Sequence, residues 1–224
     1  MSTKTRWYQE RMKEGYYRLA KKEGYRARSA YKIQQINAKY GVVKRGEAVA
    51  DLGCAPGGWS QVLVEAVGKE GTVVGVDLQR VKPIAGAKLI QGDFTKRETH
   101  ERLAAALADQ GRKQLDAVVS DMAPDMSGNY ELDQVRSIQL GEMALDFATQ
   151  HLAEGGRFVC KVFEGADFQQ FRNEVRRHFR SVYQFHPPAS RRSSSEIYLV
   201  AKGFKGAAAD GEDEAVAATD DSEE

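Results

Sequence analysis

The sequence predicts an α/β fold in which helices cover a mostly parallel sheet. From Ala48 to Lys202, short apolar runs alternate with longer segments of helical periodicity, which is the pattern of strands that are each followed by a helix. After the last helical segment, two strand-like runs follow with no helix between them. Because strands joined without a crossover run antiparallel, they predict a hairpin at one sheet edge.

Each element is assigned from its own apolar pattern and from the turns that bound it. Strands are predicted at 48–52 (AVADL), 72–77 (TVVGVD), 87–92 (AKLIQG), 115–121 (LDAVVSD), 157–163 (RFVCKVF), 181–185 (SVYQF) and 196–202 (EIYLVAK). Helices are predicted between them at 59–67, 99–108, 133–151 and 168–179. At 224 residues the chain has the length of one domain.

Charge divides the chain into three parts. Residues 1–45 carry 13 Lys and Arg against 3 Asp and Glu, and they form a basic, mostly helical extension of the α/β domain at 46–205. Residues 206–224 form an acidic tail without an apolar face, which we expect to be disordered. Without the tail, the chain has 33 basic and 24 acidic residues, so it suits a polyanionic partner.

Several classes of protein are disfavoured. No uncharged apolar run reaches the roughly 18 residues of a membrane span, and the start lacks a secretory apolar core, so we expect a cytoplasmic protein with no membrane partner. Cys54 and Cys160 lie in hydrophobic segments, and the four histidines are scattered. We therefore expect no metal site and no hydrolase triad.

The basic extension also contains aromatic residues: Trp7, Tyr8, Tyr16, Tyr17, Tyr25 and Tyr31. Rings that stack on bases beside cations that meet phosphates suit single-stranded RNA. For most individual rings, packing against the domain is the better interpretation. The RNA interpretation applies to the segment as a whole.

A glycine turn after the first strand indicates a ligand loop at the carboxyl end of the sheet. In DLGCAPGGWSQ, the glycines permit a close backbone approach and the next helix points its amides at the ligand. Asp77 and Asp93 end the next two strands, where carboxylates can accept hydrogen bonds from a nucleoside. A nicotinamide cofactor is the main rival, but G-x-G-x-x-G is absent and Pro56 cannot donate an amide to pyrophosphate. A cofactor without phosphate, such as S-adenosylmethionine, fits better.

Three charged residues lie near the same edge, and two of them interrupt apolar strand patterns. Asp121 and Lys161 lie near the carboxyl ends of their strands, and Glu196 opens a strand that runs the other way. A buried charge costs several kcal/mol unless it is paired. The topology therefore brings these three side chains together. The alternative for each is an edge charge that reaches solvent, and for Lys161 taken alone the two interpretations are equally compatible with the sequence.

With these motifs assembled, the chain resembles the FtsJ-type ribosomal RNA 2′-O-methyltransferases, the large-subunit methyltransferase E family. The resemblance covers roughly residues 5–205 and rests on DLGCAPGGWSQ, VVGVDLQ, QGDF, VVSDMAPDMSG, GGRFVCKVFEG and SSEIYLVAKG in that order. Cys54 departs from it at a position where a smaller residue such as Ala is common. The acidic tail lies outside the resemblance.

The resemblance implies a Rossmann-like S-adenosylmethionine-dependent methyltransferase domain. The implied reaction is methyl transfer to the ribose 2′-hydroxyl of a uridine in 23S ribosomal RNA within the large ribosomal subunit, with S-adenosylhomocysteine as product. It also implies a catalytic tetrad at Lys32, Asp121, Lys161 and Glu196. S-adenosylmethionine would be bound by Gly57, Trp59, Asp77, Asp93 and Asp121. A monomer is the expected state.

Alternatives remain at four points. Lysine is mostly protonated at neutral pH, so Lys161 could be the base or could orient the hydroxyl and stabilise developing negative charge. Arg191 and Arg192 either grip substrate phosphates or form a solvated turn. The substrate could instead be transfer RNA or a messenger cap. A non-catalytic ribosome-assembly factor with this fold is the alternative outside the enzymes.

Overall fold

The computed structural model describes residues 15–190 and 195–206. Its seven strands form one sheet: β1 Ala48–Leu52, β2 Thr72–Asp77, β3 Ala87–Gln91, β4 Leu115–Ser120, β5 Leu152–Phe163, β6 Phe179–Phe185 and β7 Glu196–Phe204. The helices are α2 Ala30–Tyr40, α3 Gly58–Val67, α4 Arg97–Ala108, α5 Tyr130–His151 and α6 Phe168–His178. Residues 15–23 are helical as well.

The sheet has the order β3-β2-β1-β4-β5-β7-β6 and is mostly parallel. The neighbours from β3 to β5 all pair in parallel, whereas β7 pairs antiparallel with both β5 and β6. This confirms the predicted fold class and the antiparallel hairpin at one edge. Since β6 and β5 both oppose β7, β6 runs in the direction of β5 and its carboxyl end lies at the same sheet edge.

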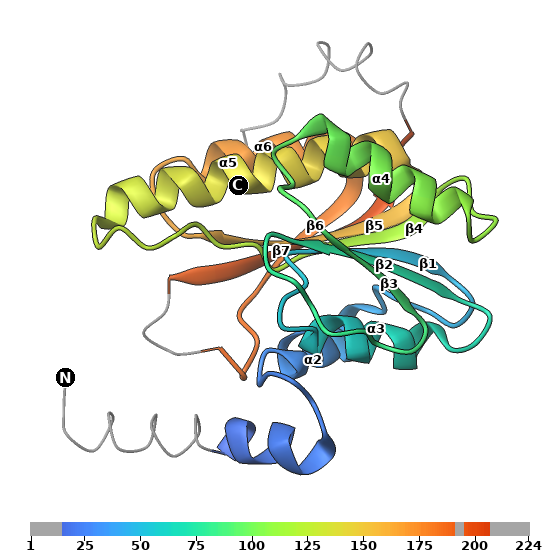
Figure 1. Cartoon of the computed structure of the whole chain (residues 1–224). Helices are drawn as coiled ribbons and strands as arrows, with labels where there is room; N and C mark the ends of the chain where they lie inside the picture. Colours follow the sequence, from blue (N-terminus) through green and yellow to red (C-terminus); the bar gives the residue numbers. More distant parts are fainter. Residues whose placement is uncertain (1–14, 191–194, 207–224) are drawn as a thin grey trace, which may run out of the picture.

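Helices cover both faces of the sheet in three layers (Figure 1). Helices α4, α5 and α6 lie on one face, and α2 and α3 lie on the other. The alternation of side chains along β1 separates the two cores: Ala50 and Leu52 pack toward α5, while Val49 packs toward α3. None of the helices in residues 15–190 and 195–206 is long and apolar enough to cross a membrane.

Two boundaries differ from the sequence prediction by more than two residues. Strand β5 begins at Leu152 rather than at residue 157, because Leu152 pairs with Leu115 before the chain makes an irregular turn that includes Gly155 at φ 79°. Helix α5 begins at Tyr130. The side-chain oxygen of Asn129 caps the helix by accepting hydrogen bonds from two backbone amides of its first turn. Neither difference moves the carboxyl ends of the strands.

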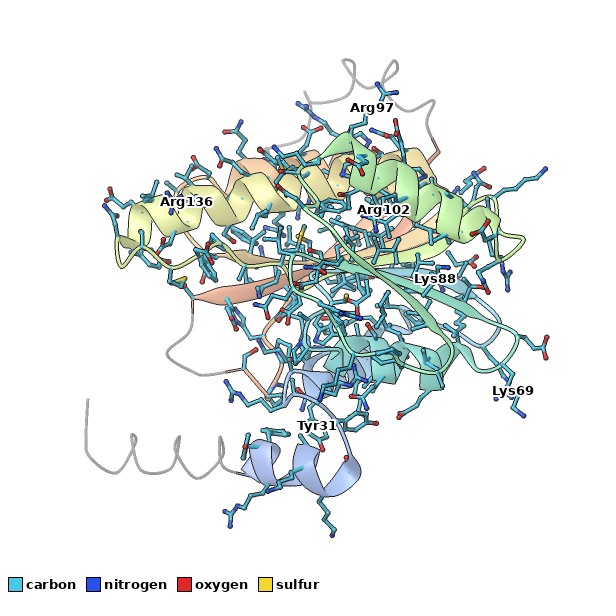
Figure 2. All side chains as sticks on the ribbon, viewed as in Figure 1. Tyr31, Lys69, Lys88, Arg97, Arg102 and Arg136 are labelled. Carbon is cyan, nitrogen blue, oxygen red and sulfur yellow. The ribbon has the colours of Figure 1, made fainter. Side chains whose placement is uncertain are left out.

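The described aromatic residues of the N-terminal extension mostly pack within the domain. Tyr31 is buried between the helix of residues 15–23 and the domain (Figure 2), and its hydroxyl donates to Glu23 at 2.7 Å. The Tyr25 hydroxyl donates to Glu65, and the rings of Tyr16 and Tyr25 contact that of Tyr31. For these three rings the structure favours packing, whereas Tyr17 is 65% exposed. Trp7 and Tyr8 lie outside the described residues.

Candidate active site

A cavity of about 550 Å³ opens at the carboxyl ends of four adjacent strands. The segments after β1, β2, β3 and β4 line it, with Gly53, Asp77, Asp93, Asp121 and Asp125 among the residues. Parallel strands place their following loops at one edge, which is why residues far apart in the sequence share one cavity. The arrangement brings the three predicted carboxylates, Asp77, Asp93 and Asp121, together with Asp125.

Gly53 is the position where the cavity loop requires glycine. Its φ of 78° disfavours a side chain, and an added Cβ would lie 2.8 Å from Met122 Cγ and 2.9 Å from Met122 N. The loop is also tied to β2, because the amides of Gly53 and Cys54 both donate to the Val76 carbonyl. Glycine therefore lets the segments after β1 and β4 approach closely enough to form one wall.

Asp77 and Asp93 hold their loops through backbone amides. Asp77 accepts from Ala55 N at 2.9 Å and from Gln79 N at 2.8 Å, one bond to each carboxylate oxygen. One oxygen of Asp93 accepts both the amide and the hydroxyl of Thr95, and these hydrogen bonds hold the pKa of Asp93 below its usual range. Each carboxylate oxygen has more than one acceptor site, so both residues can also accept from ligand hydroxyl or amine groups.

The chemistry of the cavity fits a nucleoside without phosphate. Its lining combines these carboxylates with the apolar side chains of Leu78, Phe94, Met122 and Leu140. A purine suits the apolar walls, and ribose hydroxyls suit Asp77. Pro56 lies in the wall and has no N–H, and carboxylates would repel a pyrophosphate. This donor and acceptor set fits S-adenosylmethionine.

Beside the cavity, four charged side chains form two ion pairs. Lys161 Nζ lies 3.0 Å from Asp121 Oδ1 and donates to the Asp121 carbonyl oxygen at 2.7 Å. Lys32 Nζ lies 2.9 Å from Glu196 Oε2. The exposed fractions of the lysine side chains are 6% for Lys161 and 8% for Lys32, so both ammonium groups are withdrawn from water and need these partners.

Tyr198 connects the two ion pairs. Its hydroxyl accepts from Lys32 Nζ at 3.1 Å and donates to Asp121 Oδ1 at 2.7 Å. It stands opposite Lys161 in the register of β5 and β7, and its side chain is fully buried. We name the five residues Lys161, Asp121, Tyr198, Lys32 and Glu196 the charge network. The structure thus brings the four predicted tetrad positions together through a residue that the sequence did not single out.

Two pKa shifts show how the charge network is balanced. Burial alone would raise the pKa of Asp121, but the charges of Lys161 and Lys32 and the hydrogen bond from Tyr198 lower it below its usual range. Burial and the nearby carboxylates raise the pKa of Tyr198 well above its usual value. Asp121 is therefore ionised and Tyr198 protonated at neutral pH. Asp121 also lines the cavity, so it belongs to both regions.

Gly57 and Trp59 follow the cavity-lining Pro56 in the chain but are not among the residues that line the cavity. Gly57 adopts φ 112° at the start of α3, where an added Cβ would meet Ile84 and Arg26. Trp59 is buried, its indole N–H donates to the Ser29 carbonyl, and its ring stacks on Tyr198 at 5.9 Å. In this structure Trp59 therefore packs against the charge network through Tyr198. Arg191 and Arg192 lie outside the described residues.

Asp51, which the sequence did not single out, is buried between the two regions. Its Oδ2 accepts from the Ser60 hydroxyl at 2.6 Å, and within the described residues Oδ1 has no hydrogen-bond partner. Burial raises the pKa of Asp51 to about 7; the Ser60 bond lowers it, and the charges of Asp121 and Asp77 raise it. The sequence signal that could have identified Asp51 is its charge inside the apolar run AVADL.

Comparison with known proteins gives the same assignment along most of the chain. The FtsJ-like methyltransferase family matches residues 25–204. A protein of Methanothrix thermoacetophila named ribosomal RNA large subunit methyltransferase E is 53% identical over 190 residues, covering 85% of this chain and 72% of the relative. One of the same name from Francisella philomiragia is 46% identical over 205 residues, covering 92% and 98%.

A solved structure supports the same assignment. A crystal structure from Plasmodium falciparum, described as a ribosomal RNA methyltransferase, aligns with a TM-score of 0.73 at 30% identity, covering 81% of this chain and all of the other. The cavity at the strand ends, the adjacent charge network and the match over residues 25–204 agree. The chain belongs to the FtsJ-like methyltransferase family.

Proposed function

We propose that this chain transfers a methyl group from S-adenosylmethionine to the 2′-hydroxyl of a uridine in 23S ribosomal RNA. The observation that carries the proposal is the charge network, in which Lys161 is fixed beside the cofactor cavity by Asp121. A ribose hydroxyl placed at Lys161 would lie next to the cavity that fits the methyl donor. The curated relatives bear the name of a ribosomal RNA methyltransferase, which supports this substrate.

For the cofactor, Asp77 would accept the ribose hydroxyls, Asp93 the adenine amine, and Asp121 would lie toward the methionine end. Gly57 and Trp59 complete the proposed binding set through the turn into α3. When bound, S-adenosylmethionine supplies an electrophilic methyl group on a sulfonium. The protein residues must then hold the attacking oxygen in line and accommodate its proton.

Lys161 is the proposed group that contacts the substrate hydroxyl. Two of its contacts, the carbonyl and the carboxylate of Asp121, fix the ammonium in place. A lysine has three N–H donors, so another can point to the ribose oxygen and stabilise negative charge as the proton leaves. In this role the hydroxyl proton leaves to water. Alternatively, Lys161 in its neutral amine form accepts that proton and becomes the ammonium. Both roles require the same position.

The rest of the charge network would hold this position without moving during the reaction. Lys32 and Glu196 form their own pair, and the Tyr198 hydroxyl ties that pair to Asp121. Fixed dipoles and charges in a water-poor site stabilise developing charge without the cost of reorganisation. We assign Lys161, Lys32, Asp121 and Glu196 as the catalytic set and Tyr198 as a positioning residue.

The substrate would be the large ribosomal subunit in the cytoplasm, with the enzyme acting as a monomer. Residues 1–45 would contribute basic groups that meet phosphates, and residues 46–205 would form the methyltransferase domain. Lys21, Lys22 and the exposed Tyr17 of the first described helix support the RNA role of that extension. The acidic tail from residue 206 lies almost entirely outside the described residues.

The test is transfer of labelled methyl from S-adenosylmethionine to large subunits that lack the modification. Wild type should yield 2′-O-methyluridine after nuclease digestion, and Lys161→Ala should lower the rate about 10²- to 10⁴-fold without loss of cofactor binding. Lys88→Ala is the matched control and should retain the rate, because Lys88 lies in β3, the outer strand on the other side of the sheet from β6. Label on transfer RNA or capped messenger RNA alone would redirect the substrate, and cofactor binding without label on any RNA would indicate an assembly factor.

A further variant separates the two roles of Lys161. Arginine is not deprotonated in proteins, so Lys161→Arg can orient a hydroxyl but cannot serve as a base. Measurable transfer by Lys161→Arg, with a rate that stays flat where the wild-type rate changes with pH, would assign the orienting role. Complete loss in Lys161→Arg, with cofactor binding and stability retained, would favour the base.

A further inference from the structure

The edge strand β6 places aromatic side chains in line with the charge network. Phe185 pairs with Tyr198 across β6 and β7, and Tyr198 pairs with Lys161 across β7 and β5. Directly opposed residues in a sheet point to the same face, so Phe185 lies on the face that carries the charge network. Phe185 also ends β6, which brings it to the sheet edge where the strand ends and the cavity lie.

Phe185 forms a cluster on the surface with two tyrosine rings and one ammonium group. Tyr40 contacts Tyr183 at 5.2 Å and Phe185 at 5.5 Å between ring centroids. Lys39 Nζ lies 4.6 Å from the centre of the Phe185 ring and 5.3 Å from that of Tyr40. We name Lys39, Tyr40, Tyr183 and Phe185 the aromatic edge.

The aromatic edge is accessible. Tyr183 is 44% exposed, Lys39 is exposed, and Tyr40 and Phe185 are half-buried. Single exposed apolar residues are common, but rings gathered beside a lysine on an edge strand form a surface that can bind a partner. In the described part of the chain β6 is the last strand of the sheet, so no further strand pairs with its outer edge.

The charge of the elements around the aromatic edge favours the binding of a polyanion. Helix α2 and strands β6 and β7 contain Lys32, Lys39, Arg180 and Lys202 but one carboxylate, Glu196, which pairs with Lys32. Arg180 pairs with Glu154 of β5, which leaves Lys39 and Lys202 as the cations beside the rings. The Lys202 ammonium donates to the Tyr40 carbonyl at 2.7 Å, so positive charge lies next to the rings. Rings with cations are the combination by which proteins bind unpaired nucleotides, because bases stack on rings and phosphates meet the cations.

Helix α2 sets the distance between the aromatic edge and the reacting ribose. Lys32, in its first turn, belongs to the charge network, and Tyr40 ends the helix eight residues later. At the α-helical rise this separation is about 12 Å, which a strand of RNA spans with a few nucleotides. The aromatic edge therefore continues the substrate path from the charge network outward along α2.

We propose that the aromatic edge binds unpaired nucleotides that flank the target ribose in the substrate RNA. The inference rests on the proposed RNA methylation and goes beyond it, because it assigns a second contact region on the opposite side of the charge network from the cofactor cavity. Tyr183 supplies the most exposed ring for stacking, and Lys39 supplies the charge for a phosphate.

Binding of a fluorescein-labelled uridine decamer, followed by anisotropy, tests the rings and the lysine separately. Tyr183→Ala should weaken binding about 5- to 50-fold, because stacking on an aromatic ring is lost. Tyr183→Phe, which keeps the ring, should bind as wild type does. Lys39→Ala should reduce the slope of log affinity against log salt concentration by about 0.7, the value for one phosphate contact on a single strand. Lys88→Ala, on the opposite edge strand β3, should leave the slope unchanged.

Methyl transfer to large subunits provides the second readout. Tyr183→Ala should raise the KM for subunits and leave kcat and cofactor affinity near wild type, since it lies away from the reacting atoms. Thermal unfolding of Tyr183→Ala checks folding, and exposed Lys39 provides a variant with little structural role. If wild type methylates subunits while Tyr183→Ala and Lys39→Ala keep wild-type KM and decamer affinity, the inference is wrong and the proposed function stands.

Two other results would also overturn the inference. If wild type methylates no RNA, the proposed function fails first, and the aromatic edge loses its assigned partner. If sedimentation shows that wild type dimerises and Tyr183→Ala is monomeric with unchanged RNA affinity, the aromatic edge is an interface between two copies of the chain, formed through the unpaired strand β6.

Discussion

The cofactor cavity and the charge network share one sheet edge but use their carboxylates differently. In the cavity, Asp77 and Asp93 accept from backbone amides of their own loops and remain partly accessible. In the charge network, Asp121 and Glu196 face the ammonium groups of buried lysines. Removing a loop carboxylate leaves no buried cation unpaired. Removing a network carboxylate leaves a buried lysine ammonium without its partner. We therefore expect cavity variants to change binding and network variants to change both turnover and stability.

The largest effect should follow the loss of Asp121, which belongs to both regions. Asp121→Ala leaves Lys161 buried without its carboxylate, and removing one partner of a buried pair costs about 3–5 kcal/mol of stability. Turnover should fall about 10²- to 10⁴-fold, and cofactor affinity should fall too. Urea unfolding, labelled methyl transfer and calorimetric titration measure the three quantities. Asp125→Ala, exposed in the same cavity wall, is the matched control; equal losses in both variants would remove the distinction between the two regions.

Asp51 is a buried carboxylate that pairs with no cation among the described residues. Its contribution to the free energy of unfolding should therefore depend on pH. Its pKa is raised to about 7 in the fold, but it ionises near pH 4 in the unfolded chain. Its contribution to stability is therefore fully present below about pH 4 and is lost as the pH rises through 7. Relative to Asp51→Asn, wild type should lose about 4 kcal/mol of unfolding free energy between pH 4 and pH 8. Urea unfolding of both proteins over this range measures it, and a constant difference would show that Asp51 ionises normally.

The smallest of the three effects belongs to the cavity. Asp77→Ala removes the proposed acceptors for the ribose hydroxyls, and a hydrogen bond to a charged group contributes about 1.5–3 kcal/mol. The dissociation constant for S-adenosylmethionine should therefore rise about 10- to 100-fold, while kcat at saturating cofactor stays near wild type. Calorimetric titration and steady-state kinetics separate the two. A fall in kcat comparable to that of Asp121→Ala would mean that the cavity also positions the reacting atoms.

The strand ends could be predicted from the sequence because their causes are local. Apolar runs of strand length located β1 and β2 at the residues where the structure has them, and the parallel topology then placed Asp77 and Asp121 at one edge. Asp121 and Lys161 stood out because their charges interrupt apolar strand patterns, and Glu196 because it opens an antiparallel strand at the same edge. For these residues, composition and order along the chain contain the information.

Other site residues could not be found in this way. Lys32 lies on a helix among other lysines, so only the family resemblance identified it. Tyr198 is a tyrosine in an apolar strand, which is normal for a core, and its role depends on the register that places it opposite Lys161. Trp59 matches the family motif, but its ring packs on Tyr198. These positions depend on tertiary packing and strand register rather than on local pattern.

The two regions also differ in how much of the chain they need. The cavity is lined by residues between Gly53 and Leu140, whereas the bond from Lys32 to Glu196 joins residues 164 positions apart. Contacts of high sequence separation close large loops and form late in folding. We expect a nascent chain to build its nucleoside cavity before its charge network, so a product truncated ahead of β7 would lack the means to transfer the methyl group. Methyl transfer activity would then indicate that α2 and β7, which contribute Lys32 and Glu196 to the charge network, are in contact.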